Sequence, residues 1–528
     1  MALAFLCSRL NREEAGILKP TAFVVDHKLR RGSTTEADGV VQQLQKLGIP
    51  ALRLDLEWPQ GVNPLELPNL ETEARKLRFR ALGAACRQQK LKALLLAHHR
   101  DDQAETVLTR LFAGRAGTGL RGIRPIADIP ECYGMHRVYR SGQSISVPEH
   151  FLPKTTWLQA ASLRMESGGI KVKRPLGSFS KDRLIATCAH WEVPWVEDES
   201  NSDRTLTVRN AVRHVFKSHR LPVALTKTSI CSLSDRVAAR VVARQTLADK
   251  LFEECQLEVN TRSGTVAVRF PERVSELSGH SKGLTIAAML VRRAVELVSP
   301  EPEVSLQQLE LPVLQIFPDL FREDSHPAGN KSLQRFTAAG VMFSHRYRSW
   351  KGHAPGEWWL LSRQMPNRGL AFPAVKVDPS LPRRHQPFRL FDGRFWIRIR
   401  SPSTRSLTVR MSGPEELGKF LQSLGSTVAN RLSAVLRKEA PGGIRYTLPM
   451  LVAENEDGSI EPVALPTLGF KVDGPQADRE WASLAWDFRY RKMHLPHPPE
   501  ADGSMENKSV FTSSLDIERT AQHHMQHL

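Results

Sequence analysis

The sequence predicts an α/β fold with a doubly wound parallel sheet over about residues 1–225. Short runs of apolar, often β-branched residues alternate there with amphipathic helical segments, which is typical of a parallel sheet covered by helices. The apolar runs are nearly continuous, as expected of strands that are buried on both faces. Polar residues follow the runs, at the positions where such sheets bind their ligands.

The first helix is expected at MALAFLCSRL, Met1–Leu10, because apolar residues recur there near the 3.6-residue helical period and Gly16 supplies a stop. The stretch is a poor secretory signal, since no basic residue precedes it and no small-residue cleavage pattern follows it. A mitochondrial presequence is a less favoured alternative. Arg9 and Arg12 suit it, but two acidic residues follow at once and serines are scarce.

Strand and helix patterns then alternate along the chain. TAFVVDH (Thr21–His27) predicts a buried strand, EADGVVQQLQKLG predicts an amphipathic helix closed by Gly48, and PALRLDLEW predicts the next strand. A charged helix is expected from Glu71 to about Gln88. KALLLAHH (Lys92–His99) predicts a third strand, and a helix follows from Asp101.

Polar residues end two of these predicted strands. Asp26 and His27 follow the first strand, and His98 and His99 follow the third. Parallel sheets bind ligands at the carboxyl ends of their strands, so these two junctions are expected to form the binding edge.

The rest of the chain divides into three parts. Residues 124–173 lose periodicity, and we interpret them as an insertion or extended loop within the first domain. Ser180 can then cap a helix that runs to His190. Residues 226–490 are expected to be helical at first and α+β afterwards. Residues 491–528 are polar with few apolar anchors, and we expect them to be disordered.

Charge and composition narrow the class of partner. Among the 528 residues, 74 Lys and Arg against 56 Asp and Glu leave a formal net charge of +18, which favours a polyanionic partner, although an ordinary basic protein would show the same excess. No stretch approaches the ~20 apolar residues needed to cross a bilayer, so we expect no membrane association. The six cysteines form no C-x-x-C pair, which argues against a zinc ribbon or a dithiol redox centre.

The densest group of chemically useful residues is AHHRDDQAETVLTRLFAGRAGTGLRGI, Ala97–Ile123. His98 and Asp102 are four residues apart, and Glu105 continues the spacing along the predicted helix. An imidazole and a carboxylate at one strand end could move a proton or orient an amine. A capping box of Asp102 and Glu105 explains the same residues equally well. A metal site is less favoured, because one His and one Asp are too few ligands.

Two basic segments accompany this group. EARKLRFRAL carries Arg75, Arg78 and Arg80, which could hold phosphate or form a solvated basic face. SNSDRTLTVRNAVRHVF mixes basic and short hydrogen-bonding side chains, which suits an RNA backbone but also an exposed charged helix. Its candidate residues are Arg204, Thr207, Arg209, Asn210, Arg213 and His214.

Five motifs follow one another in order. They are VDHKLRRGS, EARKLRFRAL, AHHRDDQAETVLTRLFAGRAGTGLRGI, RPLGSFSK and PWVEDESNSDRTLTVRNAVRH. Their order and approximate spacing resemble the tRNA(Ile)-lysidine synthetase family, which consists of N-type ATP pyrophosphatases of the PP-loop superfamily. The resemblance covers residues 1–217. HHRDDQAET paired with E-D-x-S-N-x-D and T-x-R-N-x-x-R is its most specific part.

The resemblance implies an adenine-nucleotide α-hydrolase-like fold and a ligase reaction in two steps. ATP would first adenylate the wobble cytidine of a tRNA(Ile) with a CAU anticodon. The ε-amine of L-lysine would then displace AMP, which forms a carbon–nitrogen bond and gives lysidine. The resemblance also implies Mg²⁺ to gather the phosphates and a cationic cleft to stabilise the departing pyrophosphate.

Family motifs imply roles for ten residues of this chain. His98 and Asp102 match the family's catalytic pair, and their division of roles stays open. The implied ATP-binding residues are Asp26, His27, Arg75 and Arg78, and the implied tRNA-binding residues are Arg174, Arg209, Asn210 and Arg213. The resemblance assigns no residue of this chain to the metal, since the Asp of the family's phosphate-binding loop, which is expected to help hold it, does not occur here. We expect that residues 226–490 also contact the tRNA.

One family motif does not occur in the sequence. In the family, a strand and the phosphate-binding loop S-G-G-x-D-S precede a helix that begins much like MALA, but no S-G-G-x-D-S is found in the 528 residues. Backbone amides of such a loop hold phosphates. The strand would bury about five apolar side chains worth roughly 1.5 to 3 kcal/mol each, against a whole-domain stability of about 5 to 15 kcal/mol. We therefore expect an N-terminally truncated chain, which puts the activity of the chain as written in doubt.

Two other functions stay open. A non-catalytic tRNA-binding remnant would keep Arg209, Asn210 and Arg213 but could not use ATP. Another N-type ATP pyrophosphatase acting on tRNA is the third alternative, although the lack of C-x-x-C pairs disfavours a thiolase. The resemblance implies a mitochondrial protein in a eukaryote and a cytoplasmic one otherwise. It implies no oligomeric state.

Overall fold

A computed structural model describes the chain in fourteen segments. They are residues 1–115, 117–143, 155–163, 165–195, 208–277, 282–321, 334–350, 353–366, 372–377, 387–401, 405–455, 457–472, 481 and 483–492. In these segments no helix combines the length and the apolar character that a membrane span requires.

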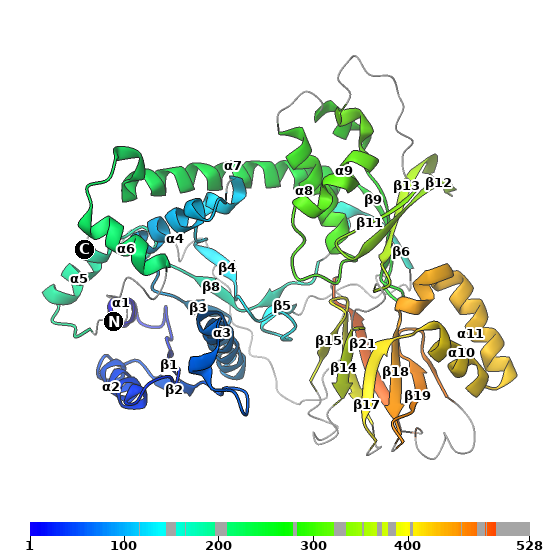
Figure 1. The fold of residues 1–528 in the computed structure, drawn as a ribbon, viewed down its shortest axis with the longest axis horizontal. Coiled ribbons are helices and arrows are strands. Elements are labelled where there is room, and N and C mark those ends of the chain that lie inside the picture. Colours follow the sequence, from blue (N-terminus) through cyan, green and yellow to red (C-terminus); the bar gives the residue numbers. More distant parts are fainter. Residues whose placement is uncertain are drawn as a thin grey trace. The chain divides into compact units, whose positions relative to one another are not determined.

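The N-terminal elements follow the predicted order (Figure 1). They are α1 (Ala2–Glu13), β1 (Ala22–Asp26), α2 (Ser33–Lys46), β2 (Ala51–Asp55), α3 (Leu70–Gln88), β3 (Ala93–Leu95) and α4 (Arg100–Phe112). The helix expected at the start of the chain is confirmed. The end of α2 also falls where the sequence predicts it, because Gly48 takes a φ of 77°, which disfavours other residues.

The parallel strands of this domain lie in two sheets. β1 and β2 pair in parallel, with Ala22 opposite Ala51 and Asp26 opposite Asp55. β3 pairs in parallel with β8 (Lys171–Lys173), whose other edge pairs antiparallel with β4 (Ile126–Asp128). Among the described residues, no strand pairs with the second edge of β1 or of β3. The parallel arrangement is therefore interrupted between these two strands.

Helix α3 joins the two sheets. Phe79 and Cys86 of α3 are buried in one cluster with Leu94 of β3. Phe23 and Val25 of β1 pack against the same cluster. One helix face thus holds both strands that flank the interruption.

Strands occur where the sequence suggested an insertion or extended loop. β4 and β8 lie near the two ends of residues 124–173 and belong to the N-terminal domain. β5 (Tyr139–Gly142) pairs with β7 (Gly168–Gly169), and β6 (Thr155–Gln159) pairs with a strand of the C-terminal region. β4 and β8, with three residues each, carry too few alternating side chains to show in the sequence pattern.

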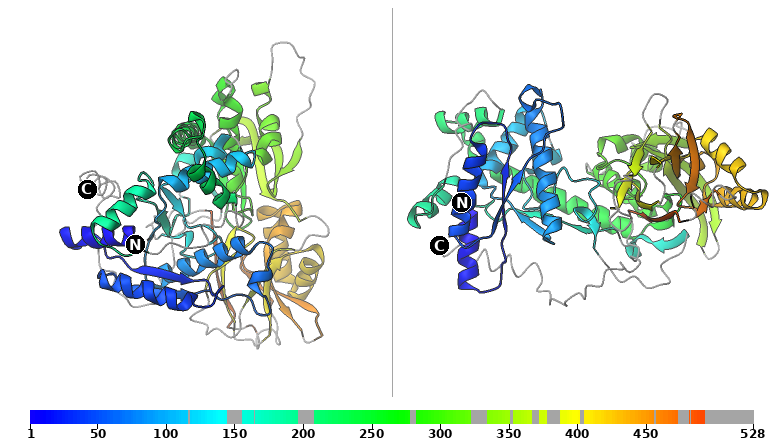
Figure 2. Two further views of the ribbon diagram at one scale, coloured as in Figure 1. Left: turned by 60° about the vertical axis from the view of Figure 1, so that its left-hand side comes forward. Right: turned by 90° about the horizontal axis from the view of Figure 1, so that it is seen from below.

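Helices lead from this domain into the rest of the chain (Figure 1 and Figure 2). α5 (Lys181–His190) is capped by Ser180, as predicted, and α6 (Val208–Ser218) and α7 (Lys227–Glu253) follow. α7 is a separate helix rather than a continuation of α6, because Pro222 lies between them. α7 packs on α4 and also on α8 (Gly283–Glu296).

The C-terminal region contains three antiparallel sheets, all visible in Figure 1. One has the order β11-β12-β13-β10-β9-β6, the second β14-β17-β18-β19-β20, and the third β15-β16-β21. The strands are β9 (Gln256–Asn260), β10 (Thr265–Arg269), β11 (Arg335–Ala338), β12 (Val341–Trp350), β13 (His353–Arg363), β14 (Ala374–Val377), β15 (Arg389–Phe391), β16 (Phe395–Arg400), β17 (Leu407–Met411), β18 (Pro449–Glu454), β19 (Ile460–Leu465), β20 (Phe470–Lys471) and β21 (Ala485–Tyr490). The helices are α9 (Glu310–Ile316), α10 (Pro414–Ser423) and α11 (Ser426–Glu439).

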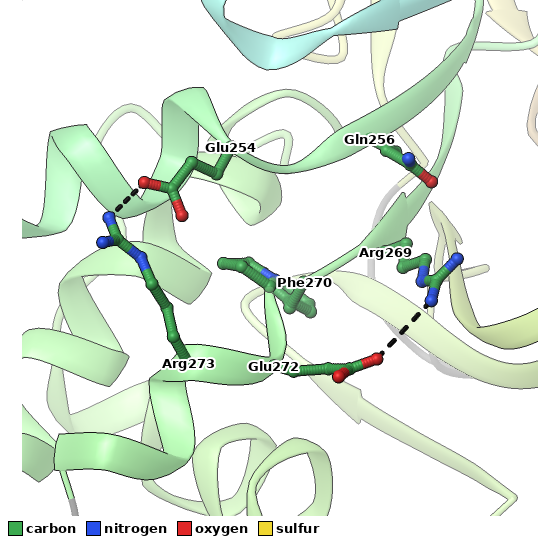
Figure 3. Close-up of a pocket in the computed structure, with 7 residues that line it drawn as sticks. Glu254, Gln256, Arg269, Phe270, Glu272 and Arg273 are labelled. Atoms are coloured by element: carbon green, nitrogen blue, oxygen red, sulfur yellow. Dashed lines mark hydrogen bonds and ion pairs between the residues drawn. The ribbon is translucent and has the colours of Figure 1, made fainter.

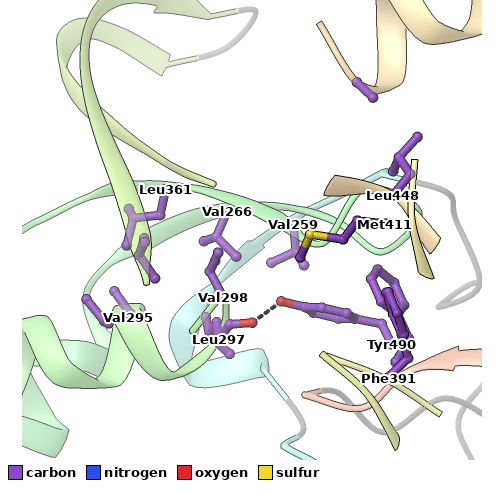
Figure 4. Close-up of a cluster of buried hydrophobic side chains, with 14 of the residues drawn as sticks. Val259, Val266, Val295, Leu297, Val298, Leu361, Phe391, Met411, Leu448 and Tyr490 are labelled. Atoms are coloured by element: carbon purple, nitrogen blue, oxygen red, sulfur yellow. Dashed lines mark hydrogen bonds between the residues drawn. The ribbon is translucent and has the colours of Figure 1, made fainter. Parts of the chain in front are cut away.

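One hydrophobic core serves these sheets. Figure 4 shows Val266 of β10, Phe391 of β15 and Tyr490 of β21 in this core, with the Tyr490 hydroxyl donating to the carbonyl of Leu297. The core reaches into the segment expected to be a disordered tail, because Lys492 is only 8% exposed. The remainder of that segment, from residue 493, lies outside the described residues.

Candidate active site at the carboxyl ends of the parallel strands

Asp26, the last residue of β1, organises the turn into α2. Its Oδ1 accepts hydrogen bonds from the Lys28 amide at 3.0 Å and the Ser33 hydroxyl at 2.7 Å, and its Oδ2 accepts one from the Thr34 hydroxyl at 2.7 Å. Burial alone would raise the pKa of Asp26, but these hydrogen bonds outweigh it and hold the pKa well below its usual range. Asp26 is therefore a charged, fully engaged carboxylate.

His27 follows Asp26 and has an unused ring nitrogen. Its Nδ1 is buried and has no hydrogen-bond partner in the described part of the chain. Burial lowers the pKa of His27, the charge of Arg78 lowers it further, and Asp26 opposes both effects. The result is a neutral imidazole beside the charged Asp26.

Two arginines of α3 share one aromatic ring. The guanidinium of Arg75 lies 4.8 Å from the centre of the Phe79 ring, and that of Arg78 lies 5.4 Å from it. The Nε of Arg75 also donates to Oε1 of Glu131 at 3.3 Å. Burial lowers the pKa of Arg78, and the charge of Arg75 adds to this effect. The nearby Arg80 instead donates to the Glu131 carbonyl at 3.1 Å.

His98 lies between β3 and α4 and also has an unused ring nitrogen. Its Nδ1 is buried without a hydrogen-bond partner among the residues that the structure describes. Burial lowers the pKa of His98 to about 4; the charge of Asp102 opposes this shift, whereas those of Arg174, Arg209 and Arg75 increase it. His98 is therefore neutral at pH 7 and surrounded by three cations.

A capping box begins α4, but its members differ from those suggested by the sequence. The Asp102 amide donates to Nδ1 of His99 at 3.4 Å, and the His99 amide donates to Oδ2 of Asp102 at 2.9 Å. Because the helix starts at Arg100, Asp102 occupies the third helical position and Glu105 lies outside the box. The proposed capping box of Asp102 and Glu105 is thus wrong.

Glu105 holds α6 against α4. Its Oε2 accepts from Nε of Arg209 at 2.8 Å, and its Oε1 accepts from Nε of Arg213 at 2.9 Å. Nη2 of Arg209 also donates to Oδ1 of Asp102 at 2.8 Å. Asn210, between the two arginines, is buried and accepts from Arg213 at 3.4 Å. Arg209, which the resemblance implies for tRNA binding, thus contacts Asp102, which it implies for catalysis.

Sequence reasoning gave Glu105 no functional role. The spacing of Asp102 and Glu105 could have indicated a role for Glu105, because residues three apart lie on the same side of a helix. The partners of Glu105 are 104 and 108 residues away, so no local pattern reveals them.

Arg174 directly follows β8. Because β8 is parallel to β3, Arg174 lies at the same sheet edge as His98. Its Nη1 donates to the Arg124 carbonyl at 2.8 Å, whereas its Nε is buried without a hydrogen-bond partner among the described residues. Burial lowers the pKa of Arg174, and the charges of Arg124 and Arg75 lower it further.

The carboxyl ends of three strands thus present three buried polar atoms that lack partners in the described structure. They are Nδ1 of His27, Nδ1 of His98 and Nε of Arg174. Buried polar groups are nearly always hydrogen-bonded, so unsatisfied ones at the carboxyl ends of these strands suit a ligand-binding site. With Arg75 and Arg78, this edge is cationic and fits an anionic ligand such as a nucleotide.

Two observations limit what this edge supplies by itself. Across the described segments, no group of three or more His, Cys, Asp or Glu side chains lies together as a metal site. The sequence also contains no S-G-G-x-D-S loop to surround phosphates with backbone amides. The groups that the described residues offer to an anionic ligand here are side chains of Arg75, Arg78 and Arg174.

A separate cavity of about 310 Å³ lies in the C-terminal region (Figure 3). Its lining residues are Glu254, Gln256, Arg269, Phe270, Pro271, Glu272 and Arg273. Arg273 pairs with Glu254, and Arg269 lies 3.7 Å from Glu272, so its charges are balanced within the wall. No residue predicted from the family motifs lines this cavity.

Comparisons with known proteins agree with the geometry. A family model described as a PP-loop domain matches residues 1–219. A probable tRNA(Ile)-lysidine synthase of Schizosaccharomyces pombe is 27% identical over 454 residues, which are 85% of this chain and 84% of that protein. This match extends well beyond residue 217, where the recognisable motifs end.

Two bacterial relatives are also similar to the chain. The tRNA(Ile)-lysidine synthase of Methylobacterium nodulans is 32% identical over 43% of this chain and 54% of its own length, and that of Bradyrhizobium sp. is 25% identical over 73% and 88%. Among solved structures, the U34-tRNA thiolase NcsA of Methanococcus maripaludis matches with 15% identity over 45% of this chain and 69% of its own, at a TM-score of 0.30, too low to add to the assignment. Residues 1–219 thus match a PP-loop domain, and the chain is similar to tRNA(Ile)-lysidine synthases over most of its length.

Proposed function

We propose that this protein is a tRNA(Ile)-lysidine synthase. It would use ATP to adenylate the wobble cytidine of a CAU-anticodon tRNA(Ile) and would then replace AMP with the ε-amine of L-lysine. The observation that supports this most is the cationic strand edge, where His27, His98 and Arg174 keep unsatisfied buried atoms. The similarity to tRNA(Ile)-lysidine synthases makes ATP, lysine and tRNA the ligands to test first.

His98 is the better candidate for handling the proton of the lysine amine. Asp102 already accepts hydrogen bonds from the His99 amide and from Arg209, whereas His98 is neutral and has a free ring nitrogen in the described structure. Phosphates bound to Arg75 and Arg174 would cancel part of the charge that lowers the pKa of His98. Its pKa would then rise toward the range that suits proton transfer.

Arginines would stabilise the departing pyrophosphate. Arg75, Arg78 and Arg174 are the cations at the strand edge, and forked guanidinium groups match phosphate oxygens well. Mg²⁺, which the family resemblance implies, would supply further positive charge on the phosphates. Arg209 and Arg213 would act on the tRNA side while Asp102 and Glu105 hold them in place.

We further propose that activity requires a strand and an S-G-G-x-D-S loop between β1 and β3. Both strands have an edge that is unpaired within the described residues, and α3 packs against both. Their carboxyl ends carry His27 and His98, so a loop at the end of an intervening strand would place its backbone amides between these imidazoles. Such amides would provide the phosphate cradle that the side chains do not.

ATP-dependent incorporation of radioactive lysine into a CAU-anticodon transcript tests the function. Two proteins are compared: residues 1–528, and the same chain preceded by a relative's strand and S-G-G-x-D-S loop. We expect incorporation by the second protein and none when the wobble cytidine is replaced by uridine.

A second candidate function, a non-catalytic tRNA-binding remnant, is favoured by the absence of S-G-G-x-D-S from the sequence. It predicts that both proteins bind the transcript and that neither incorporates lysine. Incorporation that does not depend on the wobble base would contradict both candidates.

A further inference from the structure

Three arginines of α7 form a stripe along one side of the helix. Arg236, Arg240 and Arg244 are spaced by four residues, which places successive side chains on one side and about 6 Å apart along the helix axis. Arg236 and Arg240 are exposed, and Arg244 is partly exposed. Within the part of the chain that the structure describes, none of the three guanidinium groups makes a hydrogen bond or an ion pair.

This arginine stripe is unlike an ordinary solvated helix face. Such faces usually place a carboxylate three or four residues from each cation, but no Asp or Glu stands at those distances from any of the three arginines. The arginines instead repel one another at a spacing of four. The nearby Asp249 is already used, because it accepts from Arg293 of α8 at 2.7 Å. The repulsion between the arginines thus destabilises the helix, and no carboxylate of α7 three or four residues away offsets it.

The neighbouring, buried side of α7 explains why the helix tolerates this repulsion. Ile230, Val241 and Ala248 of α7 are buried, and the helix packs on α4 and α8 (Figure 1). Tertiary packing therefore fixes α7, and the arginines are free to serve an external partner.

The stripe continues the basic side chains of the candidate active site. Phe216 of α6 packs in one cluster with Leu233 and Val237 of α7, so the C-terminal end of α6 lies beside the first half of the stripe. Lys217 lies at that end and Arg220 lies just beyond it, and both are exposed.

Earlier on the same helix, Arg209 and Arg213 bind Glu105 at the site. α6 thus carries basic residues from the site as far as α7. Basic side chains that follow one another from the candidate active site along α6 and α7 suit a ligand with regularly repeated phosphates.

We propose that Arg236, Arg240 and Arg244 bind the phosphodiester backbone of an RNA. This rests on the proposed function, in which the RNA is the tRNA whose anticodon enters the site. Guanidinium groups bind phosphates through paired hydrogen bonds without reading sequence. The stripe would therefore increase the affinity for RNA and orient it, while the candidate active site would select the base.

A triple variant, Arg236→Gln/Arg240→Gln/Arg244→Gln, tests the stripe in the full chain. Gln keeps the helix propensity of Arg, so the melting temperature should not fall. Binding of a tRNA transcript is measured without ATP or lysine, between about 50 and 200 mM salt. We expect 10- to 100-fold weaker binding at the lower salt concentration. The salt dependence, log K against log salt, should become shallower by about 2, since each lost phosphate contact removes about 0.7 to 0.9.

A matched control removes the same charge elsewhere. Lys419 of α10 and Arg437 and Lys438 of α11 are exposed, and the variant Lys419→Gln/Arg437→Gln/Lys438→Gln should bind the transcript with nearly the affinity and salt dependence of the unaltered protein. Equal losses in the two triple variants would show a general charge effect and overturn the proposal. An unchanged affinity of the α7 variant would also overturn it.

The binding measurement separates this inference from the proposed function. Stripe-dependent binding without lysine incorporation would leave the RNA surface in place and refute the enzyme. Lysine incorporation with an unchanged KM for tRNA in the α7 variant would support the enzyme and refute the stripe. If the α7 variant lost binding to anionic lipid vesicles but kept its affinity for the transcript, the partner would be a membrane surface, which would refute the proposal.

Discussion

Glu105 joins two helices through one carboxylate. Each of its oxygens accepts a hydrogen bond from a different arginine of α6, and the residue is only 5% exposed. Removing its charge would leave Arg209 and Arg213 half-buried without their main counterion. A buried pair that loses one partner is destabilised more than a surface pair.

We expect Glu105→Gln to lower the free energy of unfolding by about 2 kcal/mol. Urea denaturation followed by circular dichroism would measure it. Glu131→Gln is the matched control, because it breaks only the exposed pair with Arg75 and should change stability by less than about 1 kcal/mol. Equal, small changes in both variants would show that Glu105 does not hold α6 in place.

His98 should titrate far below an ordinary histidine. Burial and neighbouring arginines lower its pKa to about 4, so NMR titration of labelled imidazoles should show one histidine that stays neutral to about pH 5. Arg174→Gln should raise that pKa, because one of the cations is removed, and His98→Gln would assign the signal. A pKa near 6.5 in the unaltered protein would contradict the buried, cationic site.

Stability should follow the same titration. Between pH 6.5 and about 4, the unfolded chain binds a proton at His98 that the folded chain does not, so the free energy of unfolding should decrease as pH falls through this range. Urea denaturation at pH 7 and pH 5 would measure the decrease, and His98→Gln should make it smaller. An equal decrease in the variant would show that other groups cause it.

Residue types and spacing predict part of the site. They single out His98 and Asp102, and the structure places His98 just before α4 and Asp102 in its first turn, where the charge of Asp102 acts on His98. They do not show that Asp102 binds Arg209, because that contact spans 107 residues. Contacts between distant residues depend on how helices pack, which no local pattern records.

Helices and the longer strands of the N-terminal domain are predictable because apolar periodicity and glycine stops mark them. α2 and α3 show this clearly, whereas β4 and β8 were read as part of an irregular segment because each has only three residues. β6 was missed for another reason. Its partner β9 begins about one hundred residues later, so its pairing is visible only in three dimensions.

Two glycines in helices give opposite predictions about packing. A Cβ on Gly83 of α3 would lie 2.7 Å from Cγ1 of Val138 and 3.1 Å from Sγ of Cys132, both fully buried, whereas a Cβ on Gly39 of α2 would meet nothing within 4 Å. Gly83→Ala should therefore destabilise the protein by about 1 to 2 kcal/mol. Gly39→Ala should stabilise it by roughly 0.5 to 1 kcal/mol.

Thermal unfolding of the two variants would test this contrast. If Gly83→Ala proved as stabilising as Gly39→Ala, residues 132–138 would not pack closely on α3. The predicted link between α3, which carries Arg75, and the segment after β4 would then be wrong.

In the described part of residues 1–495, hydrogen bonds join the N-terminal domain to the C-terminal region. Nε1 of Trp396 donates to the buried carboxylate of Glu166 at 2.9 Å, and the Tyr133 hydroxyl donates to the Pro300 carbonyl at 3.2 Å. Residues 124–173 thus connect the sheet that carries His98 to the C-terminal sheets. The similarity to the S. pombe relative, which spans 85% of the chain, also includes both parts.

Conversion of the wobble base tests the central claim most directly. A CAU-anticodon tRNA(Ile) transcript is incubated with ATP, Mg²⁺, lysine and the protein that carries the added S-G-G-x-D-S segment, and its nucleosides are then separated and weighed by mass spectrometry. The account predicts that the wobble cytidine is replaced by a lysine adduct, and that His98→Gln abolishes the replacement while tRNA binding persists. An unmodified cytidine, despite tRNA binding and a folded protein, would contradict it.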